Sequence, residues 1–474
     1  MKIRIGMAIL GLVLFSGLAF HLTQRPWTQD ESLYISVPKM MRVEHRLPYR
    51  DFIYPQMPLY PLTMVAWQSI FGFGIVANRL LSLLALGALC VLLARRSMGH
   101  FGSALLILSN PFTWDYFILV KPHAISIFFV VYGLFFLLRS HPFLSGICMG
   151  VATMIRHLFA PLYLLPILYL LFQKEGRQWK GKELGKFGFG ALIMTVPALL
   201  ALLFEPSRFL FNIFQIHASK NLGQNRFDFI PVFRQIGDTL QNPAHLAFLI
   251  TFIVSLSLLV TRYRKRIFLQ PSIYFWLGAT FLSLLPSLFL RPFYDEYLAL
   301  MVPFISIFLS EALFHLEPAP RLKKILTGCA TVTLAIGLFF TSKHFFVSYV
   351  VQNERPKPKN ALSEVRAVGN RIAQLTDPDD LVISFWSGYT LEANRRLPVG
   401  FETGLHIIEM AGALSPEAAK DQHLLTPAQV IALLKDHKAK VVVVGLASPP
   451  GFEEEVKKHY RFFEQVGGAN LYVL

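Results

Sequence analysis

The chain has 474 residues, 54% of them hydrophobic, and its mean hydropathy is +0.48. Only 16% of the residues are charged, and the apolar residues come in long runs. This composition excludes an ordinary soluble enzyme and indicates that a lipid bilayer is the main solvent and partner. The net charge of +16 would suggest nucleic acid in a soluble protein. Here the basic residues form short clusters between apolar runs, so no nucleic-acid partner is expected.

Hydropathy predicts about eleven membrane spans, because each crossing needs about 20 apolar residues. The first run could also be read as a signal peptide, but we expect it to remain as an uncleaved span. Pro161 and Pro166 leave open whether residues 143–173 hold two spans or one broken helix. The predicted spans are roughly 3–22, 76–94, 101–118, 123–138, 143–159, 160–173, 187–204, 244–261, 269–290, 297–313 and 325–343.

The basic clusters predict an orientation. If Lys2 and Arg4 are cytoplasmic, the alternation of spans places every dense basic cluster on the same side. This agreement requires that residues 57–72 lie in the interface as an amphipathic helix and do not cross the membrane. The opposite, extracytoplasmic side then holds residues 23–75, 114–122, 205–243, 291–296 and everything after 344.

The character of the sequence changes near residue 350. Residues 351–360 read as a linker, and residues 361–474 as a small extracytoplasmic α/β domain. Its expected elements are a helix over 362–375, a strand in LVISFW, a helix near 427–436, a buried strand in KVVVVG and a terminal strand in NLYVL. The predicted fold class is therefore a polytopic α-helical membrane protein, with residues 1–350 as its membrane domain and a small C-terminal α/β domain.

The first loop, within residues 23–75, carries the densest set of candidate catalytic residues. Thr28 followed three residues later by Glu31 is a capping-box pattern, which places Asp30 in the first turn of a helix that Pro38 should keep short. The helix dipole favours the ionised form of a carboxylate there, and an ionised carboxylate can act as a general base. The alternative is that Asp30 and Glu31 only cap the helix.

Several short motifs resemble the GT-C superfamily of membrane glycosyltransferases over roughly residues 1–350. The resemblance is to the bacterial branch related to protein O-mannosyltransferases and lipid A aminoarabinose transferases. The motifs are Asp30-Glu31, Leu47-Pro48-Tyr49-Arg50-Asp51-Phe52, Gln56-Met57-Pro58-Leu59, Asn78-Arg79-Leu80-Leu81-Ser82, and Gly146-Ile147-Cys148-Met149-Gly150-Val151-Ala152 with Arg156 after it.

The resemblance implies that Asp30 activates the acceptor and that the donor is a sugar on a polyprenyl phosphate. Family members often have a second acidic residue where this chain has His123, and Asp115 could replace it. In the aminoarabinose branch a lysine that contacts phosphate precedes the paired prolines. This chain has Gln56 near that position. No cofactor follows from the residues, and a divalent cation is left open. Cys90, Cys148 and Cys329 lie in apolar runs, unlike disulfide partners or zinc ligands.

A lipid phosphate is already a good leaving group, so it needs positive charge more than a proton. Cations at membrane depth are costly and are functional candidates for that reason, although Arg156 could instead snorkel to the interface. Glu296 could bind sugar hydroxyls or only solvate its loop. The predicted substrate-binding residues are Glu31, Asp51, Gln56, Asp115, Lys121, His123, Arg156, His217, Arg291 and Glu296.

These observations predict an inverting hexosyl- or pentosyltransferase of the bacterial cytoplasmic (inner) membrane. It would move a sugar from a polyprenyl-phosphate-linked donor to a glycan, lipid or protein acceptor at the outer face. A transporter or flippase of a lipid-linked saccharide is the alternative, but no inverted repeat is evident. A third reading is an assembly scaffold whose C-terminal domain binds a partner.

Overall fold

The computed structural model describes residues 2–172, 177–216, 229–267, 271–289, 293–315, 320–346, 358–402, 404 and 414–474. The chain falls into two compact units, which we call the helical unit and the sheet unit. The helical unit comprises Met1–His21, Leu80–Pro197 and Gln224–Gln352, and the sheet unit comprises Leu22–Arg79, Ala198–Gly223 and Asn353–Leu474. The domain boundaries expected near residues 350 and 361 stay a prediction.

The helical unit is built from apolar helices. Seven of the described helices are long and apolar enough to cross a membrane, and four shorter apolar helices accompany them, so the chain is a multi-pass membrane protein. The total of about eleven crossings stays a prediction. The helices are α1 (Lys2–Gln24), α4 (Ile75–Arg96), α5 (Met98–Ser109), α6 (Pro111–Tyr116), α7 (His123–Leu138), α8 (Pro142–Ile155), α9 (Leu164–Phe172), α10 (Arg177–Phe204), α13 (Ile230–Leu240), α14 (Pro243–Ile267), α15 (Pro271–Leu284), α16 (Glu296–Ala299), α17 (Met301–His315) and α18 (Pro320–Phe346).

The segment 143–173, which the sequence left open, holds two α-helices. Helix α8 ends at Ile155, and Arg156 after it has an extended backbone. A 3₁₀ turn, His157–Tyr163, contains Pro161 and leads into α9. The break therefore lies at Arg156, and it leaves that side chain at the end of a helix.

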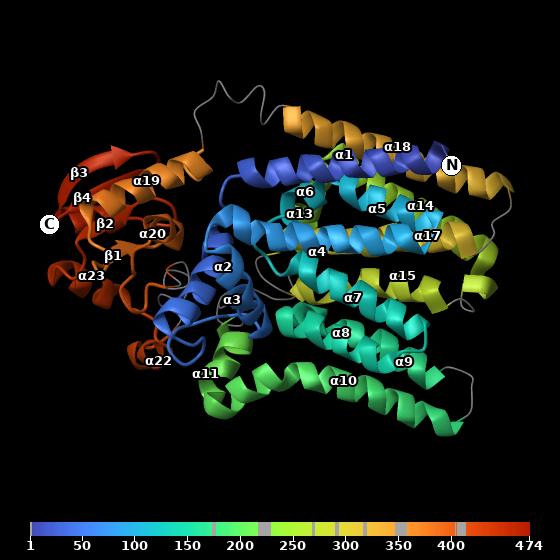
Figure 1. Ribbon diagram of the computed structural model, residues 1–474, viewed down its shortest axis with the longest axis horizontal. Coiled ribbons are helices and arrows are strands. Elements are labelled where there is room, and N and C mark those ends of the chain that lie inside the picture. The colour runs from blue at the N-terminus through green and yellow to red at the C-terminus, as the bar shows by residue number, and fades with distance from the viewer. Residues whose placement is uncertain are drawn as a thin grey trace. The chain divides into compact units, whose positions relative to one another are not determined.

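Basic residues gather at one end of the helical unit. In Figure 1 the N-terminus, the C-terminal ends of α4 and α7 and the N-terminal end of α18 lie at the same end of this unit. These ends carry Arg95-Arg96, Arg139 and Arg321. Their common location agrees with the charge alternation expected from the sequence.

Glycines bring α8 and α10 into backbone contact. A Cβ atom on Gly146 would lie 2.0 Å from the carbonyl oxygen of Phe187, and one on Gly190 would lie 2.3 Å from that of Phe143. Gly150, four residues after Gly146, faces α10 in the same way. Small residues spaced by four are typical of closely packed membrane helices. The GICMGVA motif is therefore a packing motif.

Replacing Gly190 with alanine should destabilise the helical unit, because the new methyl group meets a backbone carbonyl that cannot turn away. Overpacking of this kind costs about 1–3 kcal/mol. Gly188→Ala is the matched control on the same helix, since a Cβ there meets nothing within 4 Å. Thermal unfolding of the two purified variants in the same detergent measures the difference. Equal unfolding temperatures would contradict the close contact.

The sheet unit combines the first loop with the C-terminal residues. Its sheet has the order β1-β2-β4-β3, in which β2 pairs in parallel with β1 and β4 is antiparallel to both of its neighbours. The elements are α2 (Gln29–Lys39), α3 (Leu59–Phe71), α11 (Pro206–Leu210), α19 (Leu362–Leu375), β1 (Val382–Ser384), α20 (Ser387–Ala393), α22 (Pro416–Asp421), α23 (Pro427–Lys435), β2 (Val441–Val444), α24 (Phe452–Lys457), β3 (Arg461–Val466) and β4 (Ala469–Val473).

The expected C-terminal elements are confirmed as α19, β1, α23, β2 and β4. The edge strand β3 was not predicted. Helix α2 is short, as expected from Pro38, and ends at Lys39, one residue after the proline, although the chain continues as a π-helical turn over Met40–Glu44. The chain then leaves the helix at His45, whose backbone is left-handed. Helix α3 lies in the segment expected not to cross, and it is not among the candidate spans.

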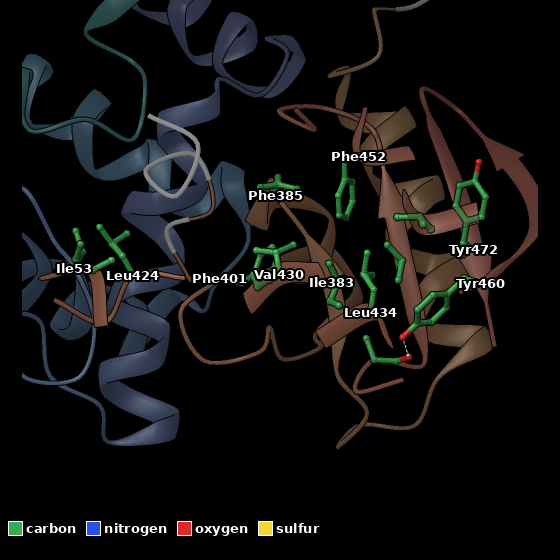
Figure 2. Close-up of a cluster of buried hydrophobic side chains, with 14 of the residues drawn as sticks. Ile53, Ile383, Phe385, Phe401, Leu424, Val430, Leu434, Phe452, Tyr460 and Tyr472 are labelled. Atoms are coloured by element: carbon green, nitrogen blue, oxygen red, sulfur yellow. Dashed lines mark hydrogen bonds between the residues drawn. The ribbon is translucent and has the colours of Figure 1, made fainter. Parts of the chain in front are cut away.

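One hydrophobic cluster joins the sheet to the first loop (Figure 2). Ile383 and Val442 from the strands, together with Leu434 from α23, form part of its centre. Ile53 of the first loop belongs to the same cluster and lies beside Leu424 in Figure 2. The first loop thus shares its core with the C-terminal residues, because it is too short to bury its own apolar side chains.

Candidate functional site

The predicted site residues are distributed over both units. The helical unit contains Asp115, Lys121, His123, Arg156 and Glu296, and the sheet unit contains Asp30, Glu31, Asp51 and Gln56. His217 and Arg291 lie outside the described residues.

In the helical unit, four predicted residues meet around the carboxylate of Glu296, the first residue of α16. Lys121 Nζ forms an ion pair with Glu296 Oε2. Arg156 Nη2 and His123 Nε2 each lie 3.6 Å from Oε1. All four residues are buried. We call this group the Glu296 cluster.

Within the Glu296 cluster itself, as far as the described residues form it, the cations outnumber the carboxylates. The ion pairs around Glu296 set two permanent cations, Lys121 and Arg156, against one carboxylate, before His123 is counted. Charge buried in a medium of low dielectric is costly unless it is compensated. The two cations are held beside one carboxylate, and an anion close to them would be attracted to them.

His123 adds unused hydrogen-bonding capacity to this cluster. Its side chain is fully buried, and in the described part of the chain neither ring nitrogen has a hydrogen-bond partner. The hydroxyl of Ser126, one turn further along α7, also lacks one among the described residues. Buried polar groups are normally satisfied, so these groups can bond to a ligand or to an ordered water.

The resemblance implied an acidic residue at the position of His123. Glu296 supplies a carboxylate beside that position. The chain has His123 there, and Glu296 lies 3.6 Å from its Nε2. Its neighbour Asp295 accepts hydrogen bonds from Gln235 Nε2 (2.5 Å) and Thr239 Oγ1 (2.9 Å), which ties α13 to the start of α16. Asp115, the other acidic candidate, is half-buried on α6.

In the sheet unit, a fully buried ion pair joins Glu31 of α2 to Arg79 of α4. Arg79 Nε lies 2.8 Å from Oε1 of Glu31, and Arg79 Nη2 lies 2.7 Å from Oε2. The guanidinium also donates to the carbonyl oxygens of Leu22, Arg25 and Pro26, at 2.7 to 2.9 Å. One arginine therefore fixes both the end of α1 and the start of α2.

Asp30 is exposed in the first turn of α2. The carboxylate of Glu31 accepts the backbone N–H of Thr28 at 3.0 Å, which is the capping arrangement expected from the sequence. Asp30 thus lies in the first turn of α2, and the next residue, Glu31, is anchored to Arg79. A carboxylate held at a helix N-terminus and open to solvent can accept a proton from an incoming hydroxyl.

Asp51 shapes the LPYRDF turn. It accepts hydrogen bonds from the Leu47 N–H (2.7 Å) and from Arg50. Partial burial raises the pKa of Asp51, but these bonds and the nearby arginine charges outweigh burial and leave its pKa below the usual value. Tyr49 in this turn has a left-handed backbone, and its hydroxyl donates to the Gln56 carbonyl at 2.6 Å. The turn is therefore held by bonds within residues 46–56 and by one from Arg208 Nη1 to the carbonyl oxygen of Arg50, at 3.0 Å.

Gln56 follows this turn, and its side-chain oxygen is buried without a hydrogen-bond partner among the described residues. It can therefore accept a bond from a ligand. Across the ranges that the structure describes, no group of three or more His, Cys, Asp or Glu residues is arranged to hold a metal ion.

The comparisons with known proteins concern most of the chain. The sequence model of Glycosyltransferase family 87 matches residues 52–290. The fold is similar to that of ArnT from Cupriavidus metallidurans bound to undecaprenyl phosphate, with 14% sequence identity and a TM-score of 0.68, and to its apo state, with 12% and 0.64. Each match covers 99% of this chain and 97% of that chain. No curated protein matches significantly.

Replacing Glu31 with glutamine should destabilise the sheet unit, because it leaves the Arg79 guanidinium buried without its counter-charge. Breaking one partner of a buried ion pair costs about 3–5 kcal/mol. Asp379→Asn is a matched control, since that carboxylate is 91% exposed. Thermal unfolding of both variants measures the cost. A Glu31→Gln variant as stable as the control would contradict an anchoring role for the pair.

Proposed function

Because the chain belongs to glycosyltransferase family 87, we propose that it transfers a sugar from a polyprenyl-phosphate-linked donor to an acceptor at the outer face of the bacterial cytoplasmic membrane. The donor class is supported by the shared fold with ArnT, which was crystallised with undecaprenyl phosphate. The acceptor is a glycan, a lipid or a protein.

The Glu296 cluster is the observation that carries this proposal. Departure of a lipid phosphate develops negative charge on its bridging oxygen, and preorganised cations lower that barrier most. Lys121 and Arg156 are such cations, since both are buried at helix ends and held by one carboxylate. We assign them to the donor phosphate, with Glu296 as the group that keeps them in place and His123 as an added donor or acceptor.

Asp30 is the proposed general base. It takes the proton of the acceptor hydroxyl while the acceptor oxygen attacks the anomeric carbon. The bond from that carbon to the phosphate oxygen breaks with its electron pair, which leaves the polyprenyl phosphate. A single displacement inverts the anomeric configuration. Glu31 directs both of its oxygens at Arg79, so we assign it to positioning α2.

The remaining first-loop residues divide between structure and binding. Asp51 uses its oxygens within its own turn, so we assign it to shaping the loop. Gln56 keeps a buried oxygen for a sugar hydroxyl. The mechanism as proposed needs no metal ion, because the cations of the Glu296 cluster are the groups assigned to the phosphate.

Asp30→Asn should lower kcat about 10²- to 10⁴-fold, since the amide cannot accept the proton. The measurement is sugar transfer by purified protein in proteoliposomes that contain a polyprenyl-phosphate sugar. Asp379→Asn, at the exposed carboxylate of the sheet unit, is the control and should keep full activity. Full activity in Asp30→Asn would refute the base assignment. A flippase would leave the donor chemically intact in both proteins.

Arg156→Gln should lower kcat about 10²-fold, because it removes one cation that faces the developing charge on the phosphate. Arg4→Gln on α1 is the matched control, since that side chain is exposed. The same proteoliposome assay measures both variants. If transfer by Arg156→Gln equals that of the control, Arg156 has only a structural or interfacial role.

A further inference from the structure

A second basic site lies at the other end of the helical unit from the Glu296 cluster. Helix α7 begins at His123 in that cluster and ends at Leu138, about 24 Å away at 1.5 Å per residue. Beside this far end, α4 and α7 enclose a cavity of about 190 Å³. It is lined by three arginines, Arg95, Arg96 and Arg139, and by the aromatic residues Tyr132, Phe135 and Phe136.

The three arginines differ from other arginines of the chain in their ion pairing. In the described ranges, none of them forms an ion pair, whereas Arg46, Arg79 and Arg371 pair with Glu402, Glu31 and Glu464. The buried carboxylate of Glu311 acts electrostatically on Arg96, but it bonds His100, at 2.8 Å. Three like charges around one cavity repel each other, and a bound anion would relieve that repulsion.

Aromatic packing orients the central guanidinium. Arg96 lies over the Phe135 ring, 3.9 Å from its centroid, and Phe135 itself is buried. Stacking of this kind fixes the guanidinium plane and leaves its edge N–H groups to bind oxygen atoms. Arg95 and Arg139 are exposed at the rim and can close on the same anion from the solvent side.

We propose that this cavity binds the phosphate of an anionic phospholipid headgroup. Phosphate oxygens match the forked geometry of arginine. The site lies between membrane helices at the basic end of the unit, where such pockets bind anionic headgroups. The cavity has room for about six water volumes of ~30 Å³ each, enough for a phosphodiester and part of its glycerol. The aromatic lining suits the adjoining apolar part of a lipid.

Native mass spectrometry of the delipidated full-length protein tests this proposal. The probes are phosphatidylglycerol, phosphatidylcholine and the soluble compound glycerol 3-phosphate. The test variant is Arg96→Gln/Arg139→Gln, and Arg321→Gln is the matched control, an exposed arginine at the same end of the unit that does not line the cavity. Arg139→Gln alone, at an exposed position, is the second variant if the double variant does not fold.

The expected result is that phosphatidylglycerol binds wild type and Arg321→Gln alike and the double variant at least about tenfold more weakly. Arg139→Gln alone should weaken binding less. Excess glycerol 3-phosphate should fail to displace the lipid. Equal binding of phosphatidylglycerol by all variants, or equal binding of phosphatidylcholine and phosphatidylglycerol, would overturn the proposal. Displacement by glycerol 3-phosphate at low concentration would overturn the lipid as the source of the phosphate.

Discussion

The buried pair between Arg79 and Glu31 is the contact on which the first-loop part of the proposed site depends. Two fully buried charges are stable only when every donor and acceptor is used, and this pair meets that condition through two bonds to the carboxylate and three to backbone carbonyls. The pair sets where α1 ends and where α2 begins. Asp30 is the residue before Glu31, so its position follows from this one contact.

Local patterns predicted the elements, whereas the pairings between distant residues could not be read from them. The periodicity of residues 362–375 and the run KVVVVG gave α19 and β2, because side-chain spacing within one element determines its buried face. Glu31 and Arg79 are 48 residues apart, and Lys121 and Glu296 are 175 apart. The sequence motifs contain each of these four residues, but which of them form ion pairs with one another follows only from the tertiary fold. Strand β3, RFFEQV, has no buried residue and no alternation of apolar and polar side chains, so its sequence carries no strand pattern.

The motifs that suggested a glycosyltransferase divide by physical role. Gly146 and Gly150 allow two helices to touch, and LPYRDF forms a turn held by hydrogen bonds to itself, to Gln56 and to Arg208. These motifs specify the fold. The carboxylate of Asp30 and the cations of the Glu296 cluster are the groups to which the proposed mechanism assigns chemistry. A resemblance carried mostly by packing motifs therefore predicts the superfamily well and the substrate poorly. The C-terminal residues share a core with the first loop, so they help to hold the loop in its fold.

The two basic sites of the helical unit differ in how their charge is compensated, and this difference suggests different kinds of anion. In the Glu296 cluster a carboxylate offsets part of the charge, so in the proposed mechanism a donor phosphate would compete with it and could leave again after reaction. Around Arg96 the described residues form no ion pair with it, and the carboxylate that acts on it, Glu311, is bonded to His100. An anion there would be retained. A catalytic site must exchange its phosphate ligand, whereas a structural lipid site must retain it. The carboxylate of Glu296 therefore distinguishes the Glu296 cluster from the cavity lined by Arg96.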